Sequence, residues 1–316
     1  MTPAFATLTP VAVQFIPEPL ITWMDLRDVP FTEPFFRDTV SKASATRPCA
    51  LSGLDELRAQ DQGPTLPPAL FVFHSSRCGS TLLSQMLASV GSNVVVSEPA
   101  VVNGILSALR PAAEQDELLR LAIRALGRSR GGAARRLIVK FTSWNVLAAA
   151  AIHRLFPDTP LLWLQREPLA VVASQAERPA GWFTWQDSGD PALGLFGLTT
   201  EQARALSPAD FRLRALQALY RAVQQAGLPF QIADYAQLPG ALWTRIAPHA
   251  GLSFSDEDVA RMQARARFDA KASERPFAPR ETTAALSAHQ RRYVAEEIAP
   301  LYRALAAQEA QPQQLL

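Results

Sequence analysis

Short apolar runs of strand length alternate along the chain with longer segments that repeat apolar residues at helical spacing. Such alternation is typical of a mainly parallel sheet with helices on both faces. We therefore predict an α/β fold, in which ligands bind at the carboxyl ends of the strands. The predicted strands span 69–73, 93–97, 136–141, 160–165 and 229–234, and the predicted helices span 82–90, 114–128, 145–155, 208–226 and 284–308.

Proline and glutamine content divides the chain into three parts. Residues 1–68 hold many prolines and end in QGPTLPP, which favours an N-terminal arm or small cap. Residues 69–308 contain every predicted strand and form the α/β domain, which a helical C-terminal segment closes. The Gln-rich residues 309–316 are expected to form a frayed tail.

Composition and charge limit the partners that the protein can have. The 316 residues are 48% hydrophobic and 19% charged, which is enough apolar surface for one sizeable core. The net charge of +2 gives no general attraction to nucleic acid or to anionic membranes, so any basic site must be local. No Lys or Arg precedes Arg27, and prolines interrupt the N-terminal apolar stretch, so neither a signal peptide nor a membrane span fits there. We expect a cytoplasmic protein with no nucleic-acid or membrane partner. The spacing of Cys49 and Cys78 fits no metal or redox motif, and both are expected to be reduced thiols.

The stretch FVFHSSRCGSTLLSQML, residues 71–87, reads as a strand, a tight turn and a helix. The backbone amides of 77–81 open the helix, where unpaired N–H groups and the helix dipole suit a phosphate or sulfate. The P-loop of nucleotide hydrolases needs a leading Gly and a Lys after the second Gly. This chain has His74 and Ser80 at those positions, and the only cation inside the turn is Arg77. The turn therefore predicts an anion site whose positive charge comes from Arg77 and not from the lysine of a P-loop.

Polar residues also follow three of the other predicted strands. Glu98 ends one strand and Lys140 another, and Arg166 ends a third, with Ser174 eight residues later on the following helix. The fork of donors on an Arg suits phosphate, and Ser adds a neutral donor. Each residue also has a structural alternative: a surface ion pair for Arg166, a helix-start carboxylate for Glu98 and a solvent-exposed charge for Lys140.

Taken together, these segments resemble the sulfotransferases that use 3′-phosphoadenosine 5′-phosphosulfate (PAPS), in the Arg-bearing form of bacterial and carbohydrate-type members. SSRCGSTLL, 75–83, is similar to their 5′-phosphosulfate loop. FPDTPLLWLQREPLAVVASQ, 156–175, is similar to their 3′-phosphate element, and SEPAVVN, 97–103, to their Glu-Pro segment. With weaker likeness at 232–262, the resemblance covers about 70–304.

The resemblance implies a fold with a P-loop and an enzyme that transfers a sulfuryl group in line from PAPS to a hydroxyl or amine. The acceptor is a small molecule or carbohydrate, the nucleotide product is 3′-phosphoadenosine 5′-phosphate (PAP), and no metal is expected. Arg77 would act in catalysis by donating to the bridging oxygen or the 5′-phosphate as negative charge develops there. The loop would hold the 5′-phosphate, and Arg166 with Ser174 the 3′-phosphate. The implied cofactor-binding residues are Ser76, Arg77, Cys78, Gly79, Ser80, Thr81, Leu82, Arg166, Ser174, Lys271 and Arg275.

The chain departs from the family pattern in three places. Cys78 stands where the family usually has Ser, which removes a hydroxyl but keeps the small size. The sequence Asp-Tyr-Ala at 234–236 differs from the usual family pattern, so no functional residue is assigned there. The Lys-Gly-containing segment that some members use against the 3′-phosphate is absent. In FDAKASERPF, 268–277, Lys271 or Arg275 takes its place, unless this is only a solvated basic loop.

The acceptor needs a base within hydrogen-bond reach of the proton that it loses. We predict that Glu98 is this base, with His74 as the alternative, and that Lys140 helps to neutralise the transferred sulfonate; a strand-end His is also often structural. In the connection 178–199, Trp182, Phe183 and Trp185 either contact the acceptor or pin the connection to the core. A P-loop kinase would share the fold but would need the loop Lys and a magnesium-holding acid. A non-catalytic nucleotide-binding module would need no base.

Overall fold

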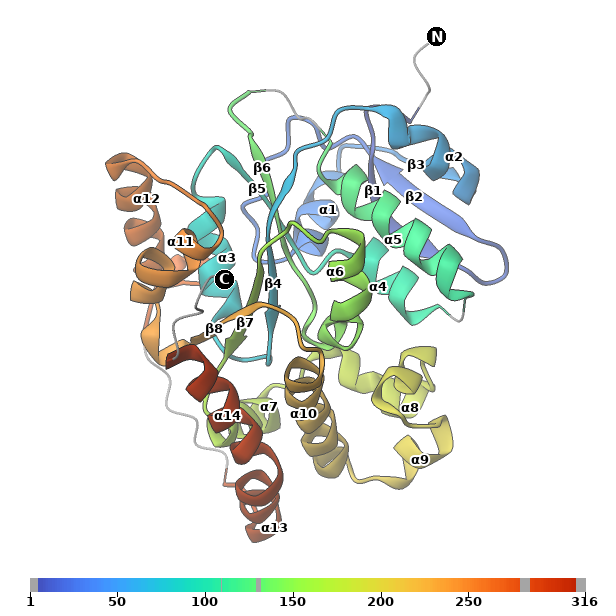
Figure 1. Ribbon diagram of the computed structural model, residues 1–316. Coiled ribbons are helices and arrows are strands. Elements are labelled where there is room, and N and C mark those ends of the chain that lie inside the picture. The colour runs from blue at the N-terminus through green and yellow to red at the C-terminus, as the bar shows by residue number, and fades with distance from the viewer. Residues whose placement is uncertain (1–4, 109, 129–131, 279–284, 311–316) are drawn as a thin grey trace.

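The computed structural model describes residues 5–108, 110–128, 132–278 and 285–310. Its centre is a five-stranded parallel sheet with the order β5-β6-β4-β7-β8 (Figure 1). The chain leaves the central strand β4 to build one half of the sheet and then crosses to build the other half, which places a ligand crevice at the carboxyl ends of the strands. All five predicted strands are confirmed within one residue at either end. They are β4 (Pro68–His74), β5 (Asn93–Ser97), β6 (Arg136–Lys140), β7 (Leu161–Gln165) and β8 (Phe230–Asp234).

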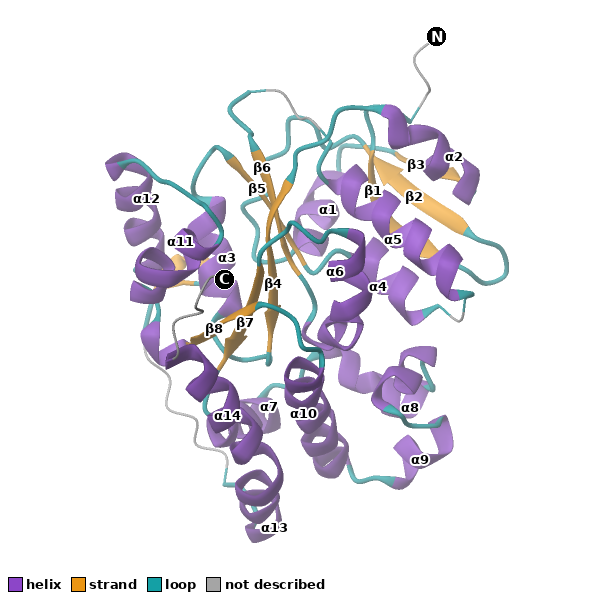
Figure 2. Cartoon of the chain, viewed as in Figure 1, coloured by secondary structure: helices purple, strands orange, loops and turns teal. Residues whose placement is uncertain are grey.

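Helices cover both faces of this sheet, as the alternating pattern predicts (Figure 2). The predicted helix over 145–155 begins two residues earlier as a 3-10 turn, η2 (Ser143–Ala148), and continues as α6. The helix expected over 284–308 begins at Ala288 and contains a π-helical segment, η7 (Val294–Ile298). The α-helices of the α/β part are α3 (Ser80–Ala88), α4 (Ala100–Ser107), α5 (Ala112–Leu126), α6 (Ala149–Leu155), α7 (Pro168–Glu177), α8 (Trp185–Ser188), α9 (Thr200–Ala205), α10 (Pro208–Gln225), α11 (Ala247–His249), α12 (Asp256–Ala266), α13 (Ala288–Tyr293) and α14 (Ala299–Ala310).

Each central strand is apolar along its whole length because it buries side chains on both faces. In β4, Phe71 and Phe73 pack into a large cluster with α5, α6, α10 and α14. The alternate residues Leu70 and Val72 pack on the other face with α3, α11 and α12. The central strands therefore read as continuous apolar runs, and their first polar residues come where the strands end.

Residues 5–62 form a smaller antiparallel sheet that packs against the same core. Its strands are β1 (Thr9–Gln14), β2 (Leu20–Met24) and β3 (Cys49–Ser52), accompanied by α1 (Phe36–Ser44) and α2 (Leu54–Ala59). Trp23 of β2 is fully buried in the large cluster that also contains Phe71. The boundary at residue 68 stays a prediction. Of the predicted tail, residues 309 and 310 lie in α14, and 311–316 lie outside the described residues.

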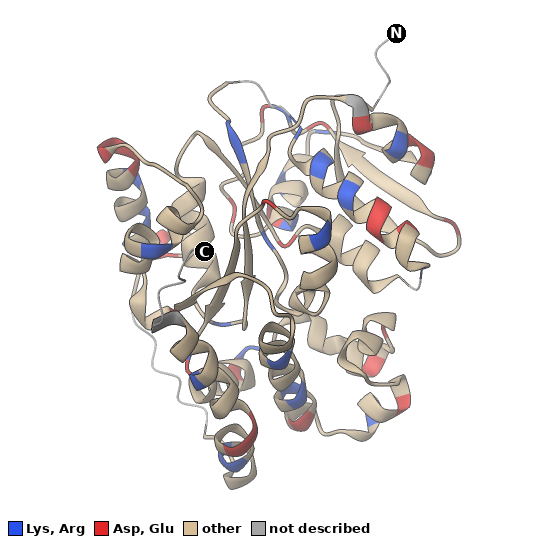
Figure 3. Ribbon diagram, viewed as in Figure 1, with Lys and Arg blue, Asp and Glu red and all other residues tan. Residues whose placement is uncertain are grey.

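Charged positions of both signs are interspersed over the outer helices in the view of Figure 3. The mixture of signs agrees with the small net charge of +2. The strands of the central sheet carry few charged residues except at their ends. In the described part of the chain, every helix is too short or too polar to cross a membrane.

Helix α4 approaches β1 so closely that a side chain at Gly104 has no room. A Cβ added to Gly104 would lie 2.7 Å from the carbonyl oxygen of Val13 and 2.8 Å from its Cγ1. The Gly residue therefore sets the distance between the N-terminal sheet and the helix that follows β5.

We expect Gly104→Ala to destabilise the protein by about 1–3 kcal/mol, because the clash with a backbone atom cannot be relieved by a side-chain rotation. This cost exceeds the roughly 0.5–1 kcal/mol that Ala gains over Gly in a helix. Chemical denaturation of the two proteins measures the difference. Gly91→Ala is the matched control, because a Cβ at Gly91 would meet nothing within 4 Å. Equal stability of Gly104→Ala and wild type would contradict the packing argument.

Candidate active site

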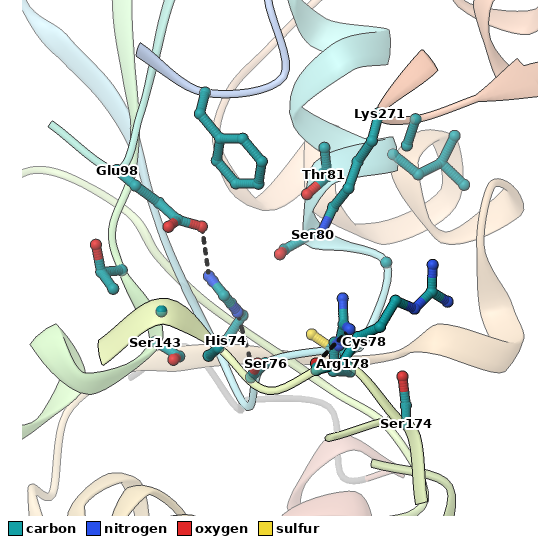
Figure 4. Close-up of a pocket in the computed structure, with 18 of the residues that line it drawn as sticks. His74, Ser76, Cys78, Ser80, Thr81, Glu98, Ser143, Ser174, Arg178 and Lys271 are labelled. Carbon is teal, nitrogen blue, oxygen red and sulfur yellow. Dashed lines mark hydrogen bonds and ion pairs between the residues drawn. The ribbon is translucent and has the colours of Figure 1, made fainter. Parts of the chain in front are cut away.

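A cavity of about 860 Å³ lies at the carboxyl edge of the central sheet, and residues that follow all five strands line it (Figure 4). Such a volume is within the range of small-molecule sites. Most of the residues that the sequence singled out meet here. The predicted residues that line the cavity are His74, Ser76, Arg77, Cys78, Gly79, Ser80, Thr81, Leu82, Glu98, Arg166, Ser174, Trp182, Trp185, Lys271 and Arg275.

The turn between β4 and α3 has an unusual backbone. Ser76, Arg77 and Gly79 have φ values of 66°, 51° and 81°, in the region that L-residues rarely adopt. The two non-glycine residues, Ser76 and Arg77, each cost about 1–3 kcal/mol in this conformation and persist where the surrounding structure holds them, often at functional sites. Gly79 is the N-cap of α3 and provides no side-chain cap. The first N–H groups of α3 therefore remain available to an anion in the cavity.

His74 holds this turn by two buried hydrogen bonds. Its Nδ1 accepts from the backbone N–H of Ser76 at 3.1 Å, so the proton lies on Nε2, which donates to the carbonyl of Phe141 at 3.0 Å. Burial, together with the charge of Lys140, lowers the pKa of His74 to about 3, so the ring is neutral. Because both ring nitrogens have backbone partners, His74 is a positioning residue. This corrects the expectation that His74 is an alternative base.

Cys78 contributes its backbone to the turn and its side chain to the core. The thiol donates to the carbonyl of Leu164 at 3.2 Å, and burial raises its pKa to about 11. The thiol is thus protonated and contributes no charge to the anion site. Both cysteines are free, as predicted.

Arg77 has one nitrogen engaged and one without a partner. Its guanidinium donates to the carbonyl of Arg178, whereas Nε is buried and has no hydrogen-bond partner among the described residues. Burial and the neighbouring charge of Arg178 lower the pKa of Arg77. A bound anion would relieve both effects, since it would satisfy Nε and compensate the two positive charges.

Arg166 and Tyr235 brace the turn from the side of β7 and β8. Arg166 donates to the carbonyl of Arg77 at 3.2 Å, and its guanidinium lies 4.6 Å from the ring centre of Tyr235. The same ring packs on Gly79, where an added Cβ would lie 2.7 Å from it. Sequence reasoning missed Tyr235, although its place directly after β8 was a usable signal. Ser174, on α7, also lines the cavity.

Glu98 faces the turn from the end of β5. Its φ is 57°, so every non-glycine residue with positive φ in the described ranges lies in this cavity. Lys140 donates to Glu98 Oε1 at 2.5 Å, and His74 Nε2 lies 3.9 Å from the same oxygen. Burial alone would raise the pKa of Glu98, but the charge of Lys140, with a smaller contribution from that of Lys271, outweighs it and lowers this pKa. Glu98 is therefore ionised at neutral pH and can accept a proton.

Lys140 does not reach the cavity itself. It is fully buried and is not among the described residues that line the cavity. Its ammonium is directed to Glu98, so the expectation that Lys140 neutralises a transferred sulfonate is corrected to a role in positioning and charging Glu98.

Positive charge predominates around the cavity. Lys271 lies at the turn between β9 (Phe268–Asp269) and β10 (Ala272–Pro276), and its side chain points toward the start of α3 in Figure 4. Desolvation, with the charges of Arg77 and Lys140, lowers the pKa of Lys271 to about 8. The lining cations are Arg37, Arg77, Arg166, Arg178, Lys271 and Arg275, and the lining acids are Glu98, Glu177 and Asp269. Sequence reasoning missed Arg37 and Arg178, which no motif marks.

The aromatic residues of the connection after α7 divide between two roles. Trp182 and Trp185 line the cavity, and Trp182 is also buried, with Nε1 donating to Ser143 Oγ at 3.2 Å. Phe183 is not among the described residues that line the cavity. It packs instead against Phe211, with 6.0 Å between the ring centres. Of the two alternatives for Phe183, the structure favours the one in which it pins the connection to the core, because its ring packs on a small apolar cluster and is not among the described cavity residues.

The chain matches no family model and no curated protein. Among solved structures, it is similar to a sulfotransferase from Alicyclobacillus acidocaldarius, with 15% identity over 78% of this chain and 96% of that one, and a TM-score of 0.45. It is also similar to the sulfotransferase STF9 from Mycobacterium avium, with 13% identity over 77% and 81% of the two chains and a TM-score of 0.48. A sulfotransferase domain from the curacin biosynthetic pathway aligns with 15% identity over 74% and 98%, and a TM-score of 0.40.

The ion pair of Glu98 with Lys140 makes stability depend on pH. The folded-state pKa of Glu98 is lowered, so its contribution is present above the ordinary Glu pKa and is lost as pH falls through the folded value. We expect Glu98→Gln to be less stable than wild type by roughly 1–3 kcal/mol at pH 7, and the difference to shrink steadily as the pH falls below the ordinary Glu pKa.

Chemical denaturation of both proteins between pH 7 and pH 3 measures the difference. Glu257→Gln is the control, because Glu257 forms an exposed pair with Arg261 that contributes little at any pH. If the stability difference between Glu98→Gln and wild type stayed constant from pH 7 to pH 3, Glu98 would not be ionised and paired in the folded protein.

Proposed function

We propose that the protein is a sulfotransferase that moves a sulfuryl group from PAPS to a hydroxyl or amine of a small-molecule or carbohydrate acceptor. One observation carries the proposal. A lysine-free anion turn with an unpartnered Arg77 Nε and the ionised carboxylate of Glu98 line the same cationic cavity. The resemblance of the turn and of the Arg166 segment to the PAPS elements supports the same conclusion.

The placement of charge favours sulfuryl over phosphoryl transfer. A sulfuryl group carries less charge than a phosphoryl group, so a metal ion and a P-loop lysine are less needed to neutralise it. Ser80 occupies the position of that lysine, and the nearby cations come from Arg77 in the turn and Lys271 in the β9–β10 hairpin. These groups suit the task of stabilising charge on a leaving phosphate.

The cavity residues fit a nucleotide with two separate anionic groups. The start of α3, with Ser80, Thr81 and the Nε of Arg77, suits the 5′-phosphate. Arg166 and Ser174 would hold the 3′-phosphate, and this contact would distinguish PAPS from an ordinary adenosine nucleotide. PAPS would supply the sulfuryl group that is transferred.

Glu98 is the residue that would take the proton from the acceptor. Its carboxylate is ionised, lies in the cavity and is oriented by Lys140. Because Lys140 also lowers the pKa of Glu98, the base is weak in the ground state, and proton transfer would be late, when the acceptor oxygen has lost most of its electron density. Arg77 would act on the other side of the transferred group, where charge develops on the leaving phosphate.

Two other functions are distinguished by their ligands. A P-loop kinase would bind ATP with magnesium, and a non-catalytic module would bind nucleotide without turnover. The strained backbone of Glu98 favours an enzyme over the module, since a module gains nothing from a carboxylate held in an unfavourable conformation.

We expect PAP to bind and to raise the melting temperature more than ATP with magnesium does. A ligand at about 100 times its Kd stabilises the native state by about 2.7 kcal/mol.

Arg166→Ala should weaken PAP binding about tenfold or more, since a charge-assisted hydrogen bond contributes roughly 1.5–3 kcal/mol. Calorimetry measures the affinity of PAP for the wild-type protein and for Arg166→Ala.

A nucleotide without the 3′-phosphate is the control for that result, because Arg166 also donates to the carbonyl of Arg77. If Arg166 acts only by bracing the turn, the substitution weakens both nucleotides equally, and the 3′-phosphate assignment is wrong. A larger stabilisation by ATP with magnesium would favour the kinase instead.

We expect Glu98→Gln to lower single-turnover sulfuryl transfer by about 10²-fold or more while PAP affinity hardly changes, because Gln keeps the shape but cannot accept the proton. The acceptor is first found by a PAPS-dependent screen of a compound library, read by mass spectrometry. His74→Asn, at saturating cofactor, should cost less, since His74 positions the turn. Transfer by Glu98→Gln at the wild-type rate would remove Glu98 from the role of base.

A further inference from the structure

Phe35 brings the N-terminal part of the chain into the cavity. It precedes α1 with an extended backbone, φ −134° and ψ 147°, and its side chain lines the cavity. The ammonium of Lys140 lies 4.9 Å from its ring centre, and that of Lys271 lies 5.2 Å from it. Both distances are within the roughly 6 Å over which a cation is attracted to an aromatic ring face.

Contacts with two distant helices hold the segment that carries Phe35. The backbone carbonyl of Glu33 accepts from the side-chain amide of Gln85 on α3 at 2.9 Å. Arg265, on α12, donates to the other end of that amide at 2.9 Å. The carboxylate of Glu33 also pairs with Lys42 on α1 at 2.7 Å. The ring of Phe35 is thus placed by interactions outside the cavity.

Mostly positive charge surrounds Lys271. The charges that act on its ammonium belong to Arg77 and Arg178 beside the turn, Lys140 from β6 and Glu98 from β5. On its own hairpin, Asp269 accepts from the backbone N–H of Lys271, and from α1 the guanidinium of Arg37 also lies 5.2 Å from the ring centre of Phe35. Because Glu98 is already paired with Lys140, the ring face of Phe35 is a further source of negative potential next to Lys271.

We propose that Phe35 is a positioning residue of the active site, whose ring holds the ammonium of Lys271 at the cavity and that of Lys140 next to Glu98. It thereby keeps Lys271 charged and directed toward the anion turn, and Lys140 directed toward Glu98. The consequence for sulfuryl transfer rests on the proposed function, whereas the placement of the two lysines by the ring does not.

Fluorinated phenylalanines test this because they weaken the negative ring face with little change in size. We would replace Phe35 by its monofluoro, difluoro and trifluoro analogues and titrate the lysine side chains by NMR with lysine-selective labelling. The chain has three lysines, Lys42, Lys140 and Lys271, so each signal can be assigned by substitution. Lys42 serves as an internal reference, since it is exposed and pairs with Glu33.

We expect the pKa of Lys271 to fall stepwise from about 8 with each fluorine, by about half a pH unit in the trifluoro form, as the ammonium loses attraction to the ring. The same analogues at Phe31, a buried neighbour that packs on Phe36, should leave Lys271 unchanged. An unchanged Lys271 titration in the Phe35 series, or an equal shift in the Phe31 series, would overturn the proposal.

PAP binding gives the functional measurement and separates the two proposals. The trifluoro form of Phe35 should bind PAP about two- to threefold more weakly than the unmodified protein at pH 8, where less Lys271 is charged, and the gap should close at pH 6.5. An equal loss at both pH values would mean that Phe35 acts by packing alone. If neither form binds PAP, the proposed function fails, and the lysine titration still decides the role of Phe35.

Discussion

The buried imidazole of His74 fixes the conformation on which the site depends. One ring nitrogen holds the amide of Ser76 and the other holds the carbonyl of Phe141, so the turn after β4 is tied to the segment after β6. With the imidazole neutral and fully engaged, the turn keeps two non-glycine residues in the left-handed region. The uncapped start of α3 and the side chain of Arg77 then face the cavity. The P-loop pattern has Gly at this position, and here a side chain provides the constraint instead.

The charge of the site is assembled from segments that are far apart in sequence. A P-loop lysine would be supplied by the loop itself, but this chain has Ser80 there. Lys271 from a late hairpin and Arg178 from the connection after α7 border the cavity instead. Such an arrangement lets the loop remain short and strained while the neutralising groups are fixed by other parts of the fold. It also makes the electrostatics of the site depend on the packing of the whole chain.

Sequence reasoning located the parts of the site that depend on local structure. The five strands, the turn and the helix after it follow from apolar periodicity, and Glu98 and Arg166 follow from their places at strand ends. The contributions of Phe35, Tyr235 and Arg178 depend on long-range packing that no local pattern encodes. For the same reason the sequence leaves open whether His74 and Phe183 act in chemistry or in structure, since only the tertiary structure reveals the backbone partners of one and the apolar neighbours of the other.

The register of β5 against β6 links the edge of the sheet to the chemistry of Glu98. Ser97 is the partner of Lys140 in the ladder, and the next amide, that of Glu98, donates to the carbonyl of Lys140 at 2.7 Å. A slip of one residue would turn the side chains of β5 to opposite faces, because successive side chains alternate along a strand. The carboxylate would then lose its ammonium partner. The hydrogen-bond ladder that secures this outer strand therefore also determines how readily Glu98 takes up a proton.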